Sequence, residues 1–529
     1  MSDRRLLIAT AFATTAAVFG AGAWGQQQPM PYSAAVAERF PPPAVRYDLP
    51  SLDDKREDFT SNEELAELVA ALLREGGSGG TRIERIDAGR SQQGTPVVAL
   101  RFARGSVARP TVALIGGQHG DEPAGTEALL VIARQLAGRE LGTVLDHVDV
   151  LLLPRANPDG AELMSRVSAG GIDINRDHLL LRTPEAQAVN ALLQRQRPVV
   201  VADLHEHTVV GRYLEKFKAV QRHDMLLQYA TVANLPPALA RASDEWFRQP
   251  VIAALASEGH RSEWYYTNPT AAGNLRLSMG GVQPDTGRNV SGLKHAVSLL
   301  LETRGIGIGR LHLARRVHSH VVAVKTVLQS AARHAEALVA LQREADAQVA
   351  AAACTGQAVV FAATTPMRRE LLMLDPETGA DKPIQVDWDS ALALRPLVQR
   401  ERPCGYWLAA GETEAVRRLR ALGLVVHTLE GAKTLQAETF VERARGEMPR
   451  PDVRGTVADG TQSILRVQVG LQKRELRAEP GSHYLPLDQP LANLAIAALE
   501  PDTQSSYFAN RLIEKLDAVA RVMAPPAAP

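Results

Sequence analysis

The sequence predicts an α/β protein whose central sheet is mostly parallel or mixed. Between residues 55 and 310, apolar runs of strand length alternate with segments of helical periodicity. Several runs end directly in polar residues, as in TVALIGG, HVDVLLLPRAN, PVVVADLHEHT and AVSLLLETRG. Alternation of strands and helices indicates parallel strands joined by crossovers, and functional groups tend to gather where such strands end.

The first elements of this part are a capped helix and a hairpin. Thr60-Ser61-Asn62-Glu63-Glu64 followed by LAELVAALLREG predicts an amphipathic helix that ends at Gly76. TRIERIDAGRS and TPVVALRFAR alternate like the two strands of a hairpin, with turn residues near Gln93 and Gly94. Two more helices are expected over residues 124–138 and 184–195.

Composition excludes some partners. The chain has 529 residues, of which 45% are hydrophobic and 22% charged, as is usual for a globular protein of two or more domains. Lys+Arg and Asp+Glu both number 59, so the formal net charge is zero. Nothing in this balance favours nucleic acid or an anionic membrane surface as a partner.

Residues 1–25 have the layout of a secretory signal peptide. Arg4 and Arg5 precede an apolar, Ala-rich run, and small residues stand where cleavage would fall. An uncleaved anchor is the alternative, but alanine and threonine are weak membrane formers. We therefore expect an exported, periplasmic protein that keeps no membrane span after processing. An extended lead-in, rich in Gln, Pro and Ala, is expected over residues 26–54.

Beyond residue 310 the pattern changes. Residues 311–352 predict a long connecting helix, and residues 353–523 predict a smaller accessory domain that is α+β or β-rich. Residues 524–529 are Pro-rich, as in a disordered tail. Cys354 and Cys404 both lie in this part, and the sequence leaves open whether they form a disulfide or stay as two buried thiols.

The stretch 111–127, TVALIGGQHGDEPAGTE, carries the first candidate metal ligands. A buried strand breaks into a Gly-rich turn that presents His119 and Glu122, a pair of one nitrogen and one carboxylate ligand. A catalytic zinc ion needs a third protein ligand and one open position. The strand end DLHEHT offers His205 and His207, and we prefer His205 because it lies nearer to the apolar run.

Two other segments offer groups suited to hydrolysis. Glu302 follows the run AVSLLL, where a dry setting raises the pKa of a carboxylate and lets it act as a general base. The alternative is a strand-end acid that pairs with Arg304. Asn175 and Arg176 can bind a carboxylate, because a guanidinium contacts both of its oxygens, although a surface turn is the alternative.

Together these residues resemble the zinc carboxypeptidase family, the carboxypeptidase A-like metallopeptidases. The resemblance covers about residues 55–310 and depends on order, spacing and strand context. It implies a mixed eight-stranded sheet flanked by helices, with one zinc ion at the strand ends. The matching motifs are His119-x-x-Glu122, Asn157-Pro158-Asp159-Gly160, Asp173-x-Asn175-Arg176, His205 and Glu302.

The resemblance also implies a role for each matching residue. His119, Glu122 and His205 match the zinc ligands, and Glu302 matches the base that activates water. Asn175 and Arg176 match the pair that holds the terminal carboxylate of the substrate. Asp173 matches the acid that orients the first histidine ligand. Arg166 matches the arginine that polarises the scissile carbonyl.

The sequence departs from the family pattern near the substrate. Asp121 stands where the digestive enzymes carry an arginine, and only Tyr265 and Tyr266 are candidates for the mobile tyrosine that closes over substrate. Asp285 and Gly287 fall near the expected floor of the specificity pocket, where Asp285 would favour basic side chains. This part of the site is therefore expected to differ from that of the digestive enzymes.

We expect a zinc metallocarboxypeptidase that releases C-terminal residues from peptides. An N-acyl amino acid amide deacylase of the same fold is the alternative, because its substrate also carries a carboxylate. A non-catalytic binding protein on this scaffold is the second alternative. The expected partner is thus a peptide or another carboxylate-bearing amide, and the oligomeric state stays open.

Overall fold

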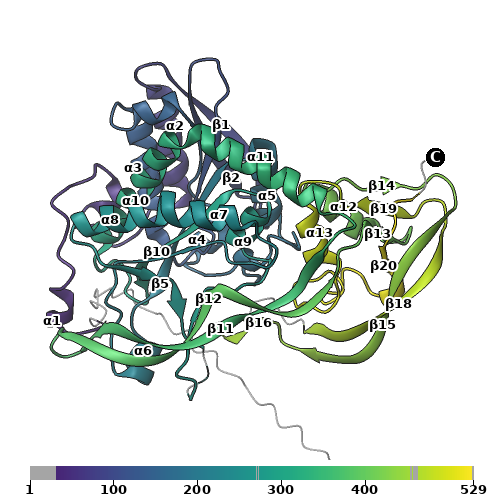
Figure 1. The fold of residues 1–529 in the computed structure, drawn as a ribbon. Helices are drawn as coiled ribbons and strands as arrows, with labels where there is room; N and C mark the ends of the chain where they lie inside the picture. The colour runs from purple at the N-terminus through teal and green to yellow at the C-terminus, as the bar shows by residue number, and fades with distance from the viewer. Residues whose placement is uncertain (1–30, 270, 272, 453–454, 457–462, 527–529) are drawn as a thin grey trace, which may run out of the picture.

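The computed structural model describes residues 31–269, 271, 273–452, 455–456 and 463–526 (Figure 1). The expected signal peptide lies outside the described residues, as do the first residues of the lead-in and the last residues of the tail. In the described part of the chain, no helix has the length and apolar character needed to cross a membrane.

The centre of the fold is an eight-stranded mixed sheet, as predicted. Its strand order is β1-β2-β4-β3-β5-β10-β6-β7. Strands β4, β3, β5 and β10 are parallel neighbours, while β1, β2 and β6 join antiparallel to their neighbours in the centre. The strands are β1 Thr81–Arg90, β2 Pro96–Arg104, β3 Thr111–Ile115, β4 Asp149–Leu153, β5 Val200–Thr208, β6 Met225–Tyr229, β7 Ser262–Trp264 and β10 Val297–Ile306.

Helices cover both faces of this sheet. In β3, Val112 and Leu114 point to one face and Ala113 and Ile115 to the other, because side chains alternate along a strand. The first face packs against α2 (Asn62–Glu75), α3 (Pro123–Ala137), α8 (Gln249–Ser257) and α10 (Leu313–Arg333). The second face packs against α5 (Pro184–Gln196).

The helical stretch expected over residues 311–352 is divided in two. Helix α10 ends at Arg333, and α11 (Ala335–Ala351) begins after His334, whose ring stacks on Trp246 at a centroid distance of 4.7 Å. Helix α10 belongs to the large core beneath the eight-stranded sheet, so it does more than connect two parts of the chain. Helix α11 then leads towards the C-terminal part of the chain (Figure 1).

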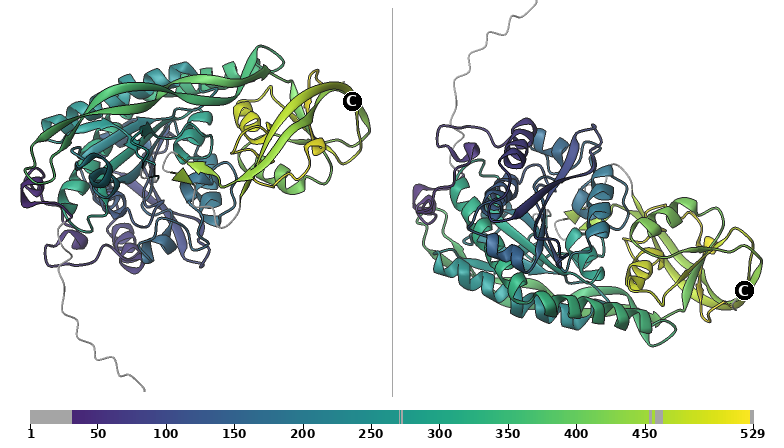
Figure 2. Two further views of the ribbon diagram at one scale, coloured as in Figure 1. Left: turned by 90° about the horizontal axis from the view of Figure 1, so that it is seen from below. Right: turned by 90° about the horizontal axis from the view of Figure 1, so that it is seen from above.

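A long hairpin follows these helices. Strands β11 (Gln357–Leu374) and β12 (Asp381–Glu401) pair antiparallel and run from the α/β part into the C-terminal part (Figures 1 and 2). Strand β12 also pairs with β9 (Leu277–Met279), which in turn pairs with β8 (Tyr266–Thr267). The hairpin therefore extends a small sheet that begins within the α/β part.

The C-terminal part is built on a six-stranded sheet of order β14-β19-β13-β20-β15-β18. It packs on the α/β part through an apolar cluster that joins α9 to α12 and α13. A disulfide links Cys354 to Cys404, which settles the question that the sequence left open. The strands are β13 Gly405–Leu408, β14 His427–Thr428, β15 Lys433–Met448, β18 Ile464–Ala478, β19 His483–Pro486 and β20 Val519–Val522.

Several short elements complete the fold. Among them, β16 and β17 pair as a small separate hairpin, and α9 follows the β9 strand. The remaining elements are α1 Ala34–Ala37, α4 Pro158–Glu162, α6 Arg212–Phe217, α7 Pro237–Ala242, α9 Gly287–Leu293, α12 Thr413–Ala421, α13 Ala492–Leu499, β16 Pro451–Asp452 and β17 Gly455–Thr456.

Candidate metal centre and substrate cavity

The loop after β3 places His119 and Glu122 at the edge of the central sheet. Glu122 is the last residue before α3, so its side chain is fixed where the helix begins. Gly120 allows the loop to approach α4, since a Cβ atom at this position would lie 2.0 Å from the backbone of Gly160. Asn157 supports the same loop by donating from Nδ2 to the carbonyl of Gln118 at 3.2 Å.

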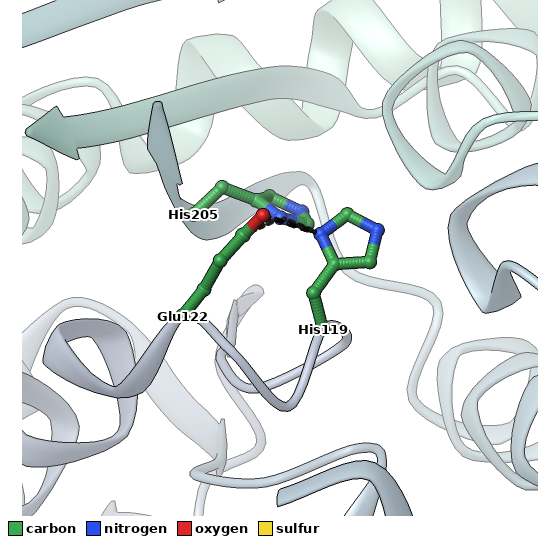
Figure 3. A group of neighbouring side chains, drawn as sticks. All are labelled: His119, Glu122 and His205. Carbon is green, nitrogen blue, oxygen red and sulfur yellow. Dashed lines mark hydrogen bonds and ion pairs between the residues drawn. The ribbon is translucent and has the colours of Figure 1, made fainter. Parts of the chain in front are cut away.

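His119, Glu122 and His205 meet at one point (Figure 3). His119 Nδ1 lies 2.8 Å from Glu122 Oε1, and His205 Nδ1 lies 2.8 Å from Glu122 Oε2. The two Nδ1 atoms are 3.1 Å apart. All three side chains are buried. In a tetrahedral zinc site, bonds of about 2.1 Å put ligand atoms roughly 3.4 Å apart, which is close to this spacing.

Carboxylates on the far side of both rings fix which nitrogen faces the centre. His119 Nε2 lies 3.1 Å from Asp173 Oδ1, and His205 Nε2 lies 3.0 Å from Asp203 Oδ2. With each Nε2–H donating to its carboxylate, both Nδ1 lone pairs and the Glu122 carboxylate converge. Such a donor set fits a divalent cation, and imidazole with carboxylate is a usual set for zinc.

The electrostatics of His205 agree with a site built for positive charge. Burial alone would lower the pKa of His205, but Asp203 and Glu122 outweigh burial and hold this pKa well above its usual value. The neighbouring carboxylates thus stabilise a cation at the position where the three side chains meet. His207, the other histidine offered by the strand, lines the adjoining cavity but is not part of this cluster.

Asp203 was not identified from the sequence. It lies two residues before His205 on β5, so both side chains project from the same face of the strand. Its Oδ2 also accepts a hydrogen bond from Gln118 Nε2 at 2.6 Å. The sequence did contain a signal for Asp203, namely its i, i+2 spacing from His205. A metal-binding histidine usually donates its second N–H to a carboxylate, and this spacing puts a carboxylate within reach.

Glu302 lies beside His205 on the neighbouring strand. The two residues are register partners in the parallel pair of β5 and β10, and Glu302 lines the cavity next to the cluster. The ion pair with Arg304 that was the alternative is not formed. Arg304 instead lies over the ring of Phe40, with 3.3 Å from its guanidinium carbon to the ring centroid.

Arg166 lies next to the cluster as well. Its Nη1 donates to Glu122 Oε1 at 3.1 Å, and its Nε donates to Asp173 Oδ2 at 3.1 Å. The guanidinium also lines the cavity. It is therefore held within reach of any group that binds at the metal position.

Arg176 forms an ion pair with a residue of the C-terminal part. Its Nε donates to Oδ2 of Asp452, in β16, at 2.7 Å, and its Nη1 donates to the carbonyl of Asn175 at 2.8 Å. Among the described residues, nothing accepts a hydrogen bond from its Nη2, and the residue lines the cavity. Asn175 lies alongside, where its Oδ1 accepts from the backbone N–H of Gly287 at 2.8 Å.

A buried ion pair holds this C-terminal segment against the site. Arg450 Nη2 donates to Asp285 Oδ2 at 2.7 Å, and both side chains are fully buried. Gln504 Nε2 donates to the carbonyl of Pro451 at 2.8 Å. The suggestion that Asp285 binds basic side chains of substrate is therefore wrong, because this carboxylate serves the contact between the two parts of the chain.

Other residues of the cavity were only partly foreseen. Tyr265 and Tyr266 line it, together with Tyr213, whereas Asp121 does not line it. Arg288, in the first turn of α9, also lines the cavity and was not considered from the sequence. No local pattern marks Arg288, since its position depends on how α9 packs against the sheet.

The chain is similar in sequence to known carboxypeptidases. The family model of zinc carboxypeptidases matches residues 77–307. Carboxypeptidase 2 of Trichophyton rubrum is 28% identical over 429 residues, which cover 79% of this chain and 78% of the relative. This alignment is longer than the family match and so extends beyond it. Carboxypeptidase SOL1 of Arabidopsis thaliana is 31% identical over 143 residues, covering 24% of this chain and 29% of the relative.

Solved structures of metallo-carboxypeptidases are also similar to this chain. One is a metallo-carboxypeptidase from Pseudomonas aeruginosa, in complex with (2-guanidinoethylmercapto)succinic acid. It is 21% identical, with a TM-score of 0.40, and the match covers 52% of this chain and 69% of that structure.

Proposed function

We propose that this chain is a zinc metallocarboxypeptidase that releases residues from the C-terminal ends of peptides, and the match of residues 77–307 to the zinc carboxypeptidase family supports this proposal. The observation that supports this most is the convergence of His119, Glu122 and His205 beside Glu302. In this proposal the three converging side chains hold one zinc ion, and Asp173 and Asp203 orient the two rings.

Glu302 is the proposed general base. A zinc ion held by the cluster would act as a Lewis acid and would make water a stronger acid at neutral pH. Glu302 accepts a proton from the attacking water and later gives it to the leaving amine. Its position on β10, in register with His205, supports this role because it puts the carboxylate at the edge of the cluster.

Arg166 and Arg176 act on the substrate in this proposal. Arg166 stabilises the negative charge that develops on the scissile carbonyl oxygen, and its contacts with Glu122 and Asp173 hold it in place beforehand. Arg176 and Asn175 bind the terminal carboxylate, for which the Nη2 group of Arg176 has hydrogen-bond capacity to spare. Binding the carboxylate there makes cleavage fall at the end of a chain.

The proposed enzyme has a catalytic domain and an accessory domain, and it is exported. Residues 55–310 act as the catalytic domain, and residues 311–352, whose first helix α10 packs in the core of this domain, lead on to residues 353–523, which form an accessory domain. The contact of Asp452 with Arg176 supports a role for that domain in the site. The signal-peptide pattern of residues 1–25 supports export to the periplasm, and the disulfide suits an oxidising compartment.

Substitution of Arg176 tests the carboxylate-binding role. We expect Arg176→Gln to raise KM for peptides with a free C-terminus by about 10- to 100-fold, with a smaller change in kcat, since hydrogen bonds to charged groups contribute about 1.5–3 kcal/mol. Initial rates with one peptide in free-acid and C-terminal amide forms measure this. The amide should be a poor substrate of both proteins.

Two results would oppose the proposal. An unchanged KM in Arg176→Gln would show that this arginine does not bind the carboxylate. Release of acyl groups from N-acyl amino acids, without any shortening of peptides, would favour the amide deacylase instead.

A further inference from the structure

The substrate cavity contains a third guanidinium that forms no ion pair with a carboxylate of the described residues. Arg166 contacts Glu122 and Asp173, and Arg176 contacts Asp452. Arg288 has no carboxylate partner among the residues that the structure describes. A buried charge usually has an ionic partner, so the unpaired guanidinium in this cavity invites an anion.

The contacts of Arg288 leave one edge of its guanidinium available. Nη2 donates to the carbonyl of Gly281 at 2.8 Å, and Nε makes a longer contact of 3.3 Å with Asn289 Oδ1. Within the described residues, Nη1 has no hydrogen-bond acceptor. Glycine at 280 makes room for this group, because a Cβ atom there would lie 2.7 Å from Nη1.

Arg288 stays charged where it lies. Burial lowers its pKa to about 10, which still leaves the guanidinium protonated at neutral pH. The residue is 3% exposed, so water screens its charge poorly. Glu302, which lines the same cavity, and Asp203 both act to raise the pKa of Arg288, although neither forms an ion pair with it.

We propose that Arg288 selects substrates whose C-terminal residue has an acidic side chain. This inference depends on the proposed function, in which Arg176 binds the terminal carboxylate. A C-terminal glutamate or aspartate then presents its side-chain carboxylate to Arg288, while Arg176 binds the terminal carboxylate. A lysine or arginine side chain would meet repulsion, and an aliphatic side chain would leave the cation without a partner.

The observations favour this assignment over a basic preference. Asp285, the acid that would attract basic side chains, is buried against Arg450 and does not line the cavity. One edge of the Arg288 guanidinium also has no hydrogen-bond acceptor among the described residues. The nature of the released residue is thus set by α9 and by the Gly280–Gly281 turn before it.

A set of four peptides that differ only in the last residue tests the inference. With Glu, Gln, Lys or Leu at the C-terminus, we expect kcat/KM of the zinc-loaded protein to be highest for Glu, by at least tenfold over Gln. Arg288→Gln should lower kcat/KM for the peptide that ends in Glu by about 10- to 100-fold. It should change kcat/KM for the peptide that ends in Gln by less than about threefold. Arg288→Lys, which keeps the charge, should retain part of the preference.

A binding measurement gives a readout that does not depend on turnover. Calorimetric titration of the zinc-loaded protein should show tighter binding of free glutamate than of free glutamine, and Arg288→Gln should abolish the difference. Arg85→Gln is a matched control, because Arg85 is an exposed arginine on β1 outside the cavity. It should behave like the unmodified protein in both measurements.

Distinct results would overturn the two proposals. Efficient release of Lys or Leu with little release of Glu would refute the acidic preference and leave the carboxypeptidase function standing. An equal loss of kcat/KM for all four peptides in Arg288→Gln would also refute the acidic preference, because such a loss would indicate a structural role for Arg288. Failure to release any of the four residues would refute the proposed function itself.

Discussion

Replacing Glu302 with glutamine is expected to lower kcat by about 10²- to 10⁴-fold while the zinc content stays unchanged. Glutamine has nearly the same shape as glutamate but cannot accept the proton of the attacking water. Glu302 lies on β10 beside His205 and is not one of the three converging side chains, so its loss should leave the metal in place. Steady-state rates on a peptide, together with zinc analysis of the same sample, measure both quantities.

The control for this prediction is a carboxylate away from the cavity. Glu215, on α6, is exposed and does not line the cavity, so Glu215→Gln should keep full activity. Thermal melting of both variants shows whether the fold is intact. A Glu302→Gln protein with undiminished kcat would mean that another group accepts the proton.

Loss of His205 is expected to abolish zinc binding and, with it, activity. Changing a residue that only orients a metal ligand typically costs 10- to 100-fold in affinity, so removing a ligand should cost more than about 100-fold. Competition with a chromophoric chelator measures the zinc affinity of His205→Ala. The variant will also be less stable, because the buried carboxylate of Asp203 keeps only its hydrogen bond from Gln118 and loses its contact with His205.

Two further variants separate the metal role from the effect on stability. His207→Ala removes the other histidine of the same strand end, which lines the cavity outside the cluster, and it should keep its zinc. Asp203→Asn leaves the His205 ligand in place and should weaken the affinity for zinc by about 10- to 100-fold. If His207→Ala lost zinc and His205→Ala kept it, the ligand assignment would be wrong.

Much of the central fold could be predicted because its signals are local. The alternating pattern of residues 81–104 predicted the hairpin of β1 and β2, and the apolar runs predicted the strands that carry the site. His205 and Glu302 were identifiable because each follows a buried run. Since the carboxyl ends of parallel strands lie at one edge of a sheet, the sequence also implied that these two residues meet.

The rest of the site depends on contacts between distant residues, which no periodicity reveals. Asp452 is 276 positions from Arg176, and their pairing requires β16 to lie against the α/β part. Arg450 reaches Asp285 in the same way, and this buried pair overturned the expected role of that acid. His334 divides the helical stretch near a packing contact with Trp246, although Ala-rich segments on both sides favour a continuous helix.

We expect the zinc-loaded protein to remove residues from the C-terminal ends of peptides through the cluster of His119, Glu122 and His205. The most direct test follows one peptide by mass spectrometry in ¹⁸O-labelled water. We predict a ladder of products shortened from the C-terminus, each with one ¹⁸O atom in its new terminal carboxylate, and no ladder after chelation of the metal. Cleavage inside the peptide, shortening from the N-terminus, or a ladder that persists without metal would contradict it.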